Sequence, residues 1–461
     1  MRRCRARETT RSGPALLDAS PGPSLSPLLE THYPRRSPRV FLGLTEVCGY
    51  YTNLRLGFSE LGIRSAFVAL EEHPFQYGDQ PSNRIIRWAQ RSTRRRLGAR
   101  TQPARLWWGA VDLAARVLLF IWALVSFDVF VFGFGSTFFR NLELPLLKLL
   151  GKRIVCVFHG SDERPPYLSG YVMRGSAGPS TDVAIAMTEV MKDRIRRIER
   201  YADVVVSHTL SAHLHERPIV PFLSLGIGYR MASVPRAEIP SSNGTVRILH
   251  APSRPDAKGT PRIRAAVASL KAKGHSIELV EIVNRPNADV LQELAKCDLI
   301  VDEVWSDTPM AGFAAEAACY GKPAVVGGYG WDLLREMVPA ERFPPSHICH
   351  PDALEAAIER LVVDAEYRRE LGERARLFVE SRWTCRKVAE AYLELIKGHG
   401  LEQLLRDPKG RLYLQGCGME EQRVRQTVRA FIERGGRAAL QISDRPDWED
   451  AFLRFAGLGD D

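Results

Sequence analysis

Two patterns of hydrophobic and polar positions alternate along the chain. Short apolar runs are followed by longer stretches in which apolar residues recur every three or four positions. The runs fall at 39–44, 65–70, 128–134, 153–158 and 203–207, and then again at 246–251, 276–283, 298–304 and 322–328. Runs that are apolar throughout predict strands of a parallel sheet covered by helices on both faces. The pattern therefore predicts two α/β domains.

The segments between and around these blocks predict the domain boundaries. Residues 1–37 are rich in Arg, Pro and Ser without periodicity, which predicts a disordered tail. The stretch Ile239–Gly244 has the composition of a linker. We expect a first Rossmann-like domain at 38–237 with a basic insertion at 83–105, a linker at 238–245, a second Rossmann-like domain at 246–398 and an extension at 399–461. The extension predicts a βαβ-like unit: strand 411–415, helix 420–434 and strand 438–443.

Composition limits the class of protein. The 461 residues are 45% hydrophobic and 26% charged, which is typical of globular domains. Eight scattered cysteines without a CxxC pair are typical of a reducing compartment, so we expect a cytoplasmic protein. The tail lacks the apolar core of a secretory signal. The cluster His347–His350 has too few spaced ligands for a metal site, so we expect no metal and no cofactor.

The positive charge is concentrated near the N-terminus. Residues 1–105 contain 18 Arg and 8 acidic residues, which accounts for the whole net charge of +10. The segment Asn83–Arg105 has eight Arg and no acid, and Trp88, Trp107 and Trp108 lie in or beside it. Basic and aromatic residues together favour peripheral contact of 83–108 with the inner face of an anionic membrane. A mobile, solvated insertion is the alternative; nucleic acid is not expected, because no recognised binding motif accompanies the charge.

The longest apolar stretch runs from Leu113 to Gly135. Arg116 and Asp128 interrupt it, which leaves only Val117–Phe127 without a charge. That length is too short to cross a bilayer. We therefore expect a buried helix that leads into a buried strand.

Two segments of the second block carry candidate chemistry. The loop 253–260 follows a strand, precedes a helix and contains Arg254, Lys258, Gly259 and Thr260. Cations and exposed amides at a helix N-terminus suit a diphosphate, although a turn with solvated charges has the same composition. Glu316 is the one charge on an otherwise apolar helix at 312–320. It suits either a bidentate acceptor for ribose hydroxyls or a structural ion-pair partner.

From Arg39 to about Ile396 the chain resembles the family-four retaining glycosyltransferases of the GT-B class (glycosyl transferases group 1). The run from Glu316 to Val325 is similar to the family's second acidic motif, E-A-x-A-x-G-x-P-V. The loop from Arg254 to Thr260 resembles its Arg…Lys-Gly motif, one residue shorter. The segment Glu46–Tyr50 resembles its glycine-bearing loop, and Phe158–Asp162 its histidine-bearing segment.

The resemblance implies a GT-B fold, with two Rossmann-like domains facing across a cleft, and a transfer from a nucleotide-diphosphate sugar with retention and without metal. The first domain would hold the acceptor and the second the donor nucleotide. The basic and aromatic residues at 83–108 then favour an acceptor that is lipid-linked or an envelope glycan, as in cell envelope or polysaccharide biosynthesis. The implied roles are: catalysis for His159; donor diphosphate binding for Arg254, Lys258, Gly259, Thr260 and Gly49; ribose binding for Glu316; and donor-sugar contacts for Asp162, Glu303, Thr308 and Gly312. The usual pKa of histidine suits His159 to orienting the sugar or shuttling a proton.

The chain departs from the family at one position. The first acid of the family's Glu-x7-Glu pair is Thr308 here, and Asp302, Glu303 or Asp307 could replace it. Two alternatives to a transferase therefore stay open. One is a catalytically inactive module that binds a sugar nucleotide, and the other is a sugar-nucleotide epimerase with the GT-B fold.

Overall fold

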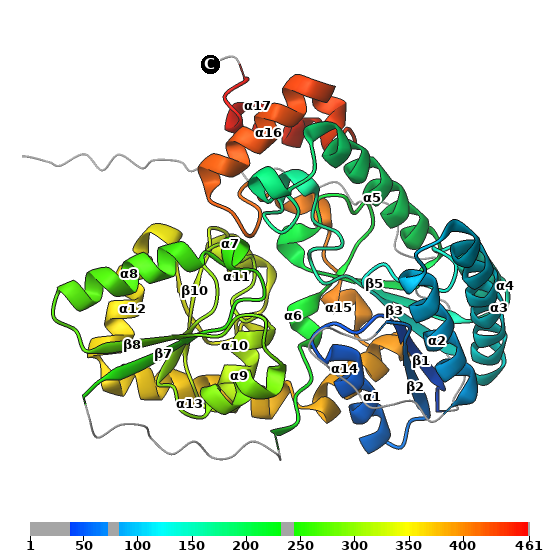
Figure 1. The fold of residues 1–461 in the computed structure, drawn as a ribbon, viewed down its shortest axis with the longest axis horizontal. Helices are drawn as coiled ribbons and strands as arrows, with labels where there is room; N and C mark the ends of the chain where they lie inside the picture. The colour runs from blue at the N-terminus through cyan, green and yellow to red at the C-terminus, as the bar shows by residue number, and fades with distance from the viewer. Residues whose placement is uncertain (1–36, 72–82, 232–243, 460–461) are drawn as a thin grey trace, which may run out of the picture.

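The computed structural model describes residues 37–71, 83–231 and 244–459. All but the last residue of the predicted tail 1–37 and most of the predicted linker 238–245 lie outside these ranges. The described residues form two parallel sheets that lie side by side, each with helices on both faces (Figure 1).

The first sheet has six parallel strands in the order β2-β1-β3-β4-β5-β6. They are β1 Val40–Leu44, β2 Ser65–Ala69, β3 Val129–Gly133, β4 Arg153–Val157, β5 Val204–Ser207 and β6 Val220–Pro221. Every residue of β1, β3 and β4 is buried, as expected of central strands covered on both faces. The apolar runs predicted β1 to β5, whereas the two-residue β6 left no recognisable pattern.

Two helical layers cover this sheet. One contains α1 Tyr50–Glu60 and α14 Cys385–Lys397, whose buried residues share a cluster with one side of the strands. The other contains α2 Arg84–Gly98, α3 Gln102–Ser126, α4 Leu144–Leu149 and α5 Thr181–Tyr201. The expectation that the last helix before residue 398 belongs to the second domain was wrong, because α14 crosses back and packs on α1.

The second sheet has five parallel strands in the order β11-β10-β9-β7-β8. They are β7 Val246–His250, β8 Ile277–Glu281, β9 Leu299–Val301, β10 Ala324–Gly327 and β11 His347–Cys349. One face carries α8 Thr260–Ala272 and α12 Leu354–Val363. The other carries α9 Asn287–Leu294, α10 Gly312–Cys319, α11 Trp331–Met337 and α13 Ala365–Arg382. The His and Cys residues at 347–349, which the sequence grouped as a possible metal cluster, form the edge strand β11.

Both sheets have a doubly wound order, with one switch point between β1 and β3 and another between β7 and β9. Four short helices complete the connections and the C-terminal extension: α6 Phe222–Leu225, α7 Pro255–Lys258, α15 Leu401–Leu404 and α17 Pro446–Phe455, together with the longer α16 Glu421–Gly435. The predicted GT-B architecture, two Rossmann-like units plus a small extension, is confirmed by this strand order.

The predicted βαβ unit in the extension was wrong, because neither 411–415 nor 438–443 forms a strand. Leu412 and Leu414 pack against the core of the first domain, whereas Tyr413 between them packs against the core of the second. The alternating pattern therefore records a segment held between two cores. The segment Ala438–Ser443 begins within a 3-10 helix, Arg437–Leu440, and α16 and α17 join the first domain's core beside α5 (Figure 1).

For the apolar stretch after Leu113, the predicted buried strand is confirmed as β3, whereas the prediction of a buried helix was wrong. Helix α3 has 25 residues, is long and apolar enough to cross a bilayer by length and composition, and only 28% of its most apolar window is buried. Arg116 did not shorten it, because this side chain lies along the helix and binds Asp112. The helix begins eleven residues before the stretch that the sequence marked out.

Close contact between α1 and α14 depends on Gly57. A Cβ atom there would lie 1.9 Å from the carbonyl oxygen of Cys385 and 2.8 Å from Cβ of Ala389. We expect Gly57→Ala to lower the free energy of unfolding by about 1–3 kcal/mol, because the two helices must separate. Gly109→Ala in α3, where nothing lies within 4 Å, is the control and should raise it by about 0.5–1 kcal/mol. Denaturant unfolding checks both, and equal shifts of one sign would contradict the packing argument.

Candidate functional site

A cavity of about 350 Å³ lies between the two domains. It is lined by the loops that follow β1, β4, β5, β7, β8 and β9, by residues of α6, α9 and α10, by the segment after α6 and by one residue of the C-terminal extension. These loops leave the carboxyl ends of their strands, beside the switch points where ligands bind in doubly wound sheets. The volume suits a small-molecule ligand. The cavity is therefore the candidate functional site.

The loop after β1 is organised by Glu46. Its buried carboxylate accepts hydrogen bonds from the backbone N–H groups of Val47 (2.8 Å), Tyr51 (3.1 Å) and Thr52 (3.1 Å). It thereby satisfies amides at the start of α1. Gly49, the residue before α1, has φ 78°, which favours glycine. Gly49 does not itself line the cavity, and the neighbouring N–H of Tyr50 donates to the Val47 carbonyl at 2.9 Å rather than to a ligand.

His159 lines the cavity at the end of β4. Its Nε2 lies 2.9 Å from the Tyr51 hydroxyl, and its backbone N–H donates to Asp162 Oδ1 at 2.8 Å. Burial, with a smaller effect from His208, lowers the pKa of His159 to about 3. The argument from the usual pKa of histidine was therefore wrong. The imidazole is neutral near pH 7, so it can hydrogen-bond a ligand but is poorly suited to carry a proton as imidazolium.

Asp162, predicted to contact the donor sugar, does not line the cavity. It holds the turn after β4 together: its side chain accepts from His159, and its carbonyl accepts from Arg194. Burial, with the charge of Glu163, raises the pKa of Asp162 to about 7. Its position indicates a structural part in shaping the loop that carries His159.

Lys258 lines the cavity and is neutralised within the protein. Its Nζ lies 3.0 Å from Asp302 Oδ1 and 2.9 Å from Glu303 Oε2. Burial alone would lower the pKa of Lys258, but the two carboxylates hold it well above its usual range. Glu303 also accepts from the Tyr171 hydroxyl of the first domain at 3.0 Å. Both oxygens of Glu303 are therefore engaged by protein groups.

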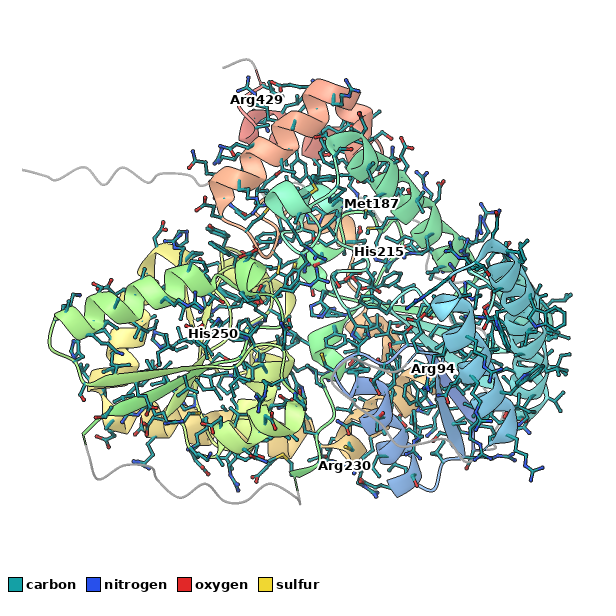
Figure 2. All side chains as sticks on the ribbon, viewed as in Figure 1. Arg94, Met187, His215, Arg230, His250 and Arg429 are labelled. Carbon is teal, nitrogen blue, oxygen red and sulfur yellow. The ribbon has the colours of Figure 1, made fainter. Side chains whose placement is uncertain are left out.

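The other predicted members of the diphosphate loop lie outside the lining. Arg254 is exposed, and its Nη1 donates to the Tyr171 carbonyl at 3.0 Å across the domain interface. Gly259 precedes α8 with φ 76° and packs against Val304. Thr260 is fully buried, with its Oγ1 2.8 Å from Nε2 of His250, which Figure 2 labels in the second domain. The structure brings only Lys258 of this loop's four predicted residues into the cavity.

The predicted residues on and before α10 do meet in the cavity. Glu316, Gly312 and Thr308 all line it. Glu316 is half-buried and accepts from Nδ2 of Asn287 at 3.1 Å. The Gly312 carbonyl accepts from the Tyr229 hydroxyl at 3.0 Å. Thr308 Oγ1 is buried without a hydrogen-bond partner within the described residues, so a ligand hydroxyl would complete its bonding.

A buried ion pair that the sequence did not single out closes one side of the cavity. Arg164, after β4, binds Asp307, after β9, and Ser211 Oγ donates to Asp307 Oδ2 at 2.7 Å. Burial alone would raise the pKa of Asp307, but Arg164 lowers it to about 2. No sequence pattern pairs an arginine of one domain with an aspartate 143 positions later.

The C-terminal extension contributes Cys417 to the lining. Its backbone N–H donates to Leu168 at 2.9 Å, and the next N–H, of Gly418, donates to Trp305 of the second domain at 2.8 Å. The Gly416–Gly418 turn therefore bridges the two domains. Both glycines have positive φ, 66° and 80°, as a tight turn requires, and the fold places this turn beside the site.

Behind the cavity, His215 lies between two carboxylates inside the first domain (Figure 2). Its Nδ1 is 2.9 Å from Glu199, and its Nε2 is 2.9 Å from Glu163. Burial alone would lower the pKa of His215, but these hydrogen bonds raise it to about 9. Glu163 also accepts from the backbone N–H of His208, which lines the cavity. The network thus supports a lining residue.

No family model matches this chain, and no curated protein matches it. Similar solved structures include the Anabaena protein HepE in complex with UDP and glucose, with 11% identity, coverage of 78% of this chain and 99% of that one, and a TM-score of 0.44. The glycosyltransferase SnogD from Streptomyces nogalater is 15% identical, with coverage of 78% of this chain and 100% of that one, and a TM-score of 0.38. A structure described as a UDP-N-acetylglucosamine 2-epimerase from Listeria monocytogenes is 15% identical, with coverage of 80% of this chain and 98% of that one, and a TM-score of 0.39. The GT-B assignment of this chain rests on its own strand order.

The ion pair between Arg164 and Asp307 gives a stability prediction. Arg164→Met should lower the free energy of unfolding by about 3–5 kcal/mol, because it leaves a buried carboxylate without its cation. The double variant Arg164→Met/Asp307→Leu should recover most of that loss, because both charges are then removed. Denaturant unfolding of both variants measures this. A double variant no more stable than Arg164→Met would contradict it.

The His215 network gives a pH prediction. The folded pKa of about 9 lies above the unfolded value near 6.5, so its contribution is complete below about pH 6.5 and is lost as the pH rises through 9. The stability difference between wild type and His215→Gln should therefore shrink from pH 6.5 to 10. Unfolding curves across that range check it. His399→Gln, whose side chain is 66% exposed, is the control and should change the free energy of unfolding only slightly.

Proposed function

We propose that this chain is a glycosyltransferase that moves a sugar from a nucleotide-diphosphate sugar to an acceptor hydroxyl, with retention of configuration. One observation carries the proposal. Lys258 and Glu316, the residues with which two motifs resemble the donor site of family-four enzymes, line a single cavity together with His159 of the opposite domain. Three segments far apart in the sequence thus converge on one site of suitable size.

In this proposal Lys258 binds the donor diphosphate and Glu316 the ribose hydroxyls. The bond between the anomeric carbon and the diphosphate oxygen breaks as the acceptor oxygen bonds to that carbon, and the proton of the acceptor hydroxyl passes to the leaving diphosphate. The Lys258 ammonium stabilises the charge that develops on the leaving diphosphate. Neutral His159 and Thr308 Oγ1 orient the sugar by hydrogen bonds. No metal or cofactor is part of this proposal.

Donor binding must rearrange the charges around Lys258. Asp302 and Glu303 already bind the Lys258 ammonium, so a diphosphate that reaches this ammonium lies beside both carboxylates. Burial, together with Asp302, raises the pKa of Glu303, so uptake of a proton there becomes easier when a second anion arrives. We infer that Glu303 releases Lys258, or is protonated, when the donor binds. Arg254 would then bind the donor diphosphate from the rim of the cavity.

For the acceptor we propose a lipid-linked or envelope glycan, handled by a cytoplasmic enzyme that contacts the inner face of the membrane through 83–108. The first domain would hold this acceptor. The exposed arginines of α2 support this proposal, because they belong to that domain and suit anionic headgroups or a charged carrier. The reaction would then belong to cell envelope or polysaccharide biosynthesis.

The donor site gives the next prediction. One UDP-, GDP-, ADP- or dTDP-sugar should raise the melting temperature of the wild type, with slow release of its nucleotide. Lys258→Ala and Glu316→Gln should each weaken binding of that donor about tenfold or more, because each loses a hydrogen bond to a charged group. Lys271→Ala, exposed on α8, is the matched control and should bind as wild type does. Thermal shift and calorimetry measure the binding.

The products distinguish the proposal from its alternatives. Nucleotide release that rises when membrane extract is added supports a transferase. Binding without any release identifies a sugar-nucleotide-binding module, and recovery of an isomerised sugar nucleotide identifies an epimerase. If no donor binds, or if both site variants bind as wild type does, the donor site is wrongly placed.

A further inference from the structure

Helix α3 presents apolar side chains on two opposite sides. Its inner side packs into the core of the first domain through Ala115, Leu119, Phe120 and Ala123. Its outer side exposes seven large apolar residues: Leu106 (72%), Trp107 (66%), Leu113 (56%), Val117 (39%), Leu118 (49%), Ile121 (49%) and Val125 (72%). At helical spacing these form one broad stripe. So many large apolar side chains exposed together mark an interaction surface.

The stripe continues onto α4. Leu144 and Leu147 of α4 are buried in the same core cluster as the inner side of α3, so both helices cover the same face of the sheet. Their outer sides therefore face the same way, at the right-hand edge of Figure 1. At the outer side of α4 the exposed residues are Leu142, Leu146, Leu149 and Leu150. We call the outer residues of α3 and α4 together the apolar face.

A basic helix flanks the apolar face. Helix α2 packs along α3, and seven arginines on α2, in the turn to α3 or in the first turn of α3 are exposed: Arg84, Arg87, Arg91, Arg94, Arg95, Arg100 and Arg105. Figure 2 labels Arg94 on this helix. The sequence has no acid between 83 and 111, and the next acid, Asp112, is buried against Arg96 and Arg116. Arg95 lies 4.7 Å from the ring centre of Trp108.

This combination selects the partner. A second protein copy would have to neutralise a row of arginines beside an apolar stripe, whereas an anionic bilayer offers phosphate groups directly above hydrocarbon. Tryptophan and arginine at the junction are typical of membrane interfaces, where long basic side chains reach the headgroups. The arginines therefore lie where the headgroup phosphates would be, and the apolar side chains lie where the acyl chains would be.

The inner side of α3 decides its orientation. At roughly 1.5 Å per residue the helix is about 37 Å long, enough to span a bilayer. A spanning helix would have to withdraw Leu119, Phe120 and Ala123 from the core that covers the first sheet. The inner side therefore keeps the helix on the domain, and only its outer side is available to lipid.

We propose that the apolar face is a membrane-docking surface: α3 and α4 lie in the plane of an anionic leaflet, with their outer side chains among the acyl chains and the α2 arginines on the headgroup phosphates. This goes beyond peripheral contact through 83–108, because it makes the outer side chains of α3 and α4 the inserted part. It does not depend on sugar transfer, so binding to membranes and turnover can fail separately.

Flotation with lipid vesicles tests the proposal on the full chain. Wild type should float with vesicles of phosphatidylcholine and phosphatidylglycerol, and less with phosphatidylcholine alone or in high salt. Val117→Glu/Ile121→Glu should lower the floated fraction at least about tenfold, because two charges would enter the acyl region. Val363→Glu/Leu377→Glu, at sites 60% and 52% exposed on the second domain, is the matched control and should float as wild type does.

Further variants and conditions give outcomes that overturn the proposal. Arg84→Gln/Arg87→Gln/Arg91→Gln should remove the preference for anionic vesicles, and an unchanged preference contradicts the role of α2. Bound protein should be released by alkaline carbonate, whereas resistance would mean that α3 spans the bilayer. Absence of flotation with every vesicle refutes docking, and a dimer in analytical ultracentrifugation that V117E/I121E dissolves would assign the face to a second copy.

Discussion

The buried ion pair between Arg164 and Asp307 is the interaction on which the geometry of the site depends. Each residue follows a strand of a different sheet, and both side chains are almost fully buried. Neither charge is tolerable in that environment without the other, so the two strand ends must meet. Ser211 adds a hydrogen bond from the loop after β5. The pair thus fixes which loops face each other, and the cavity is the space that they leave.

The charges around Lys258 follow from the same constraint. A buried ammonium needs an anion, and the loop after β9 supplies Asp302 and Glu303. The ammonium is therefore already neutralised by two carboxylates of the chain, and under the proposed function an anionic ligand must replace one of them. Such replacement favours ligands that offer an equivalent acceptor in the same place, as a diphosphate does. Burial, together with the charge of Asp302, raises the pKa of Glu303, which makes uptake of a proton by this carboxylate easier.

Local pattern predicted what local physics controls. Apolar runs predicted the buried strands of both sheets, such as β4, because a strand covered on both faces must be apolar throughout. The motifs placed Lys258 and Glu316 in one cavity. The predictions that were wrong concern contacts between segments far apart in the sequence. Helix α14 packs on α1 of the first domain, where Gly57 leaves room for it. Tyr413 packs into the core of the second domain, whereas its two neighbours pack against the first. Neither contact leaves a trace within its own segment.

Helix α3 is a second example of a feature that the local sequence pattern does not determine. Hydropathy measures how apolar a helix is, but it does not reveal how many of its sides have a neighbour. A core helix surrounded by protein and an interfacial helix with protein on one side and lipid on the other have the same composition. The distinction lies in the second layer, and among the described residues no element covers the outer sides of Leu106, Trp107 and Val125. Since water is a poor solvent for such a surface, the free energy of covering it is available to a partner, and the arginines beside it make an anionic leaflet the partner that gains most.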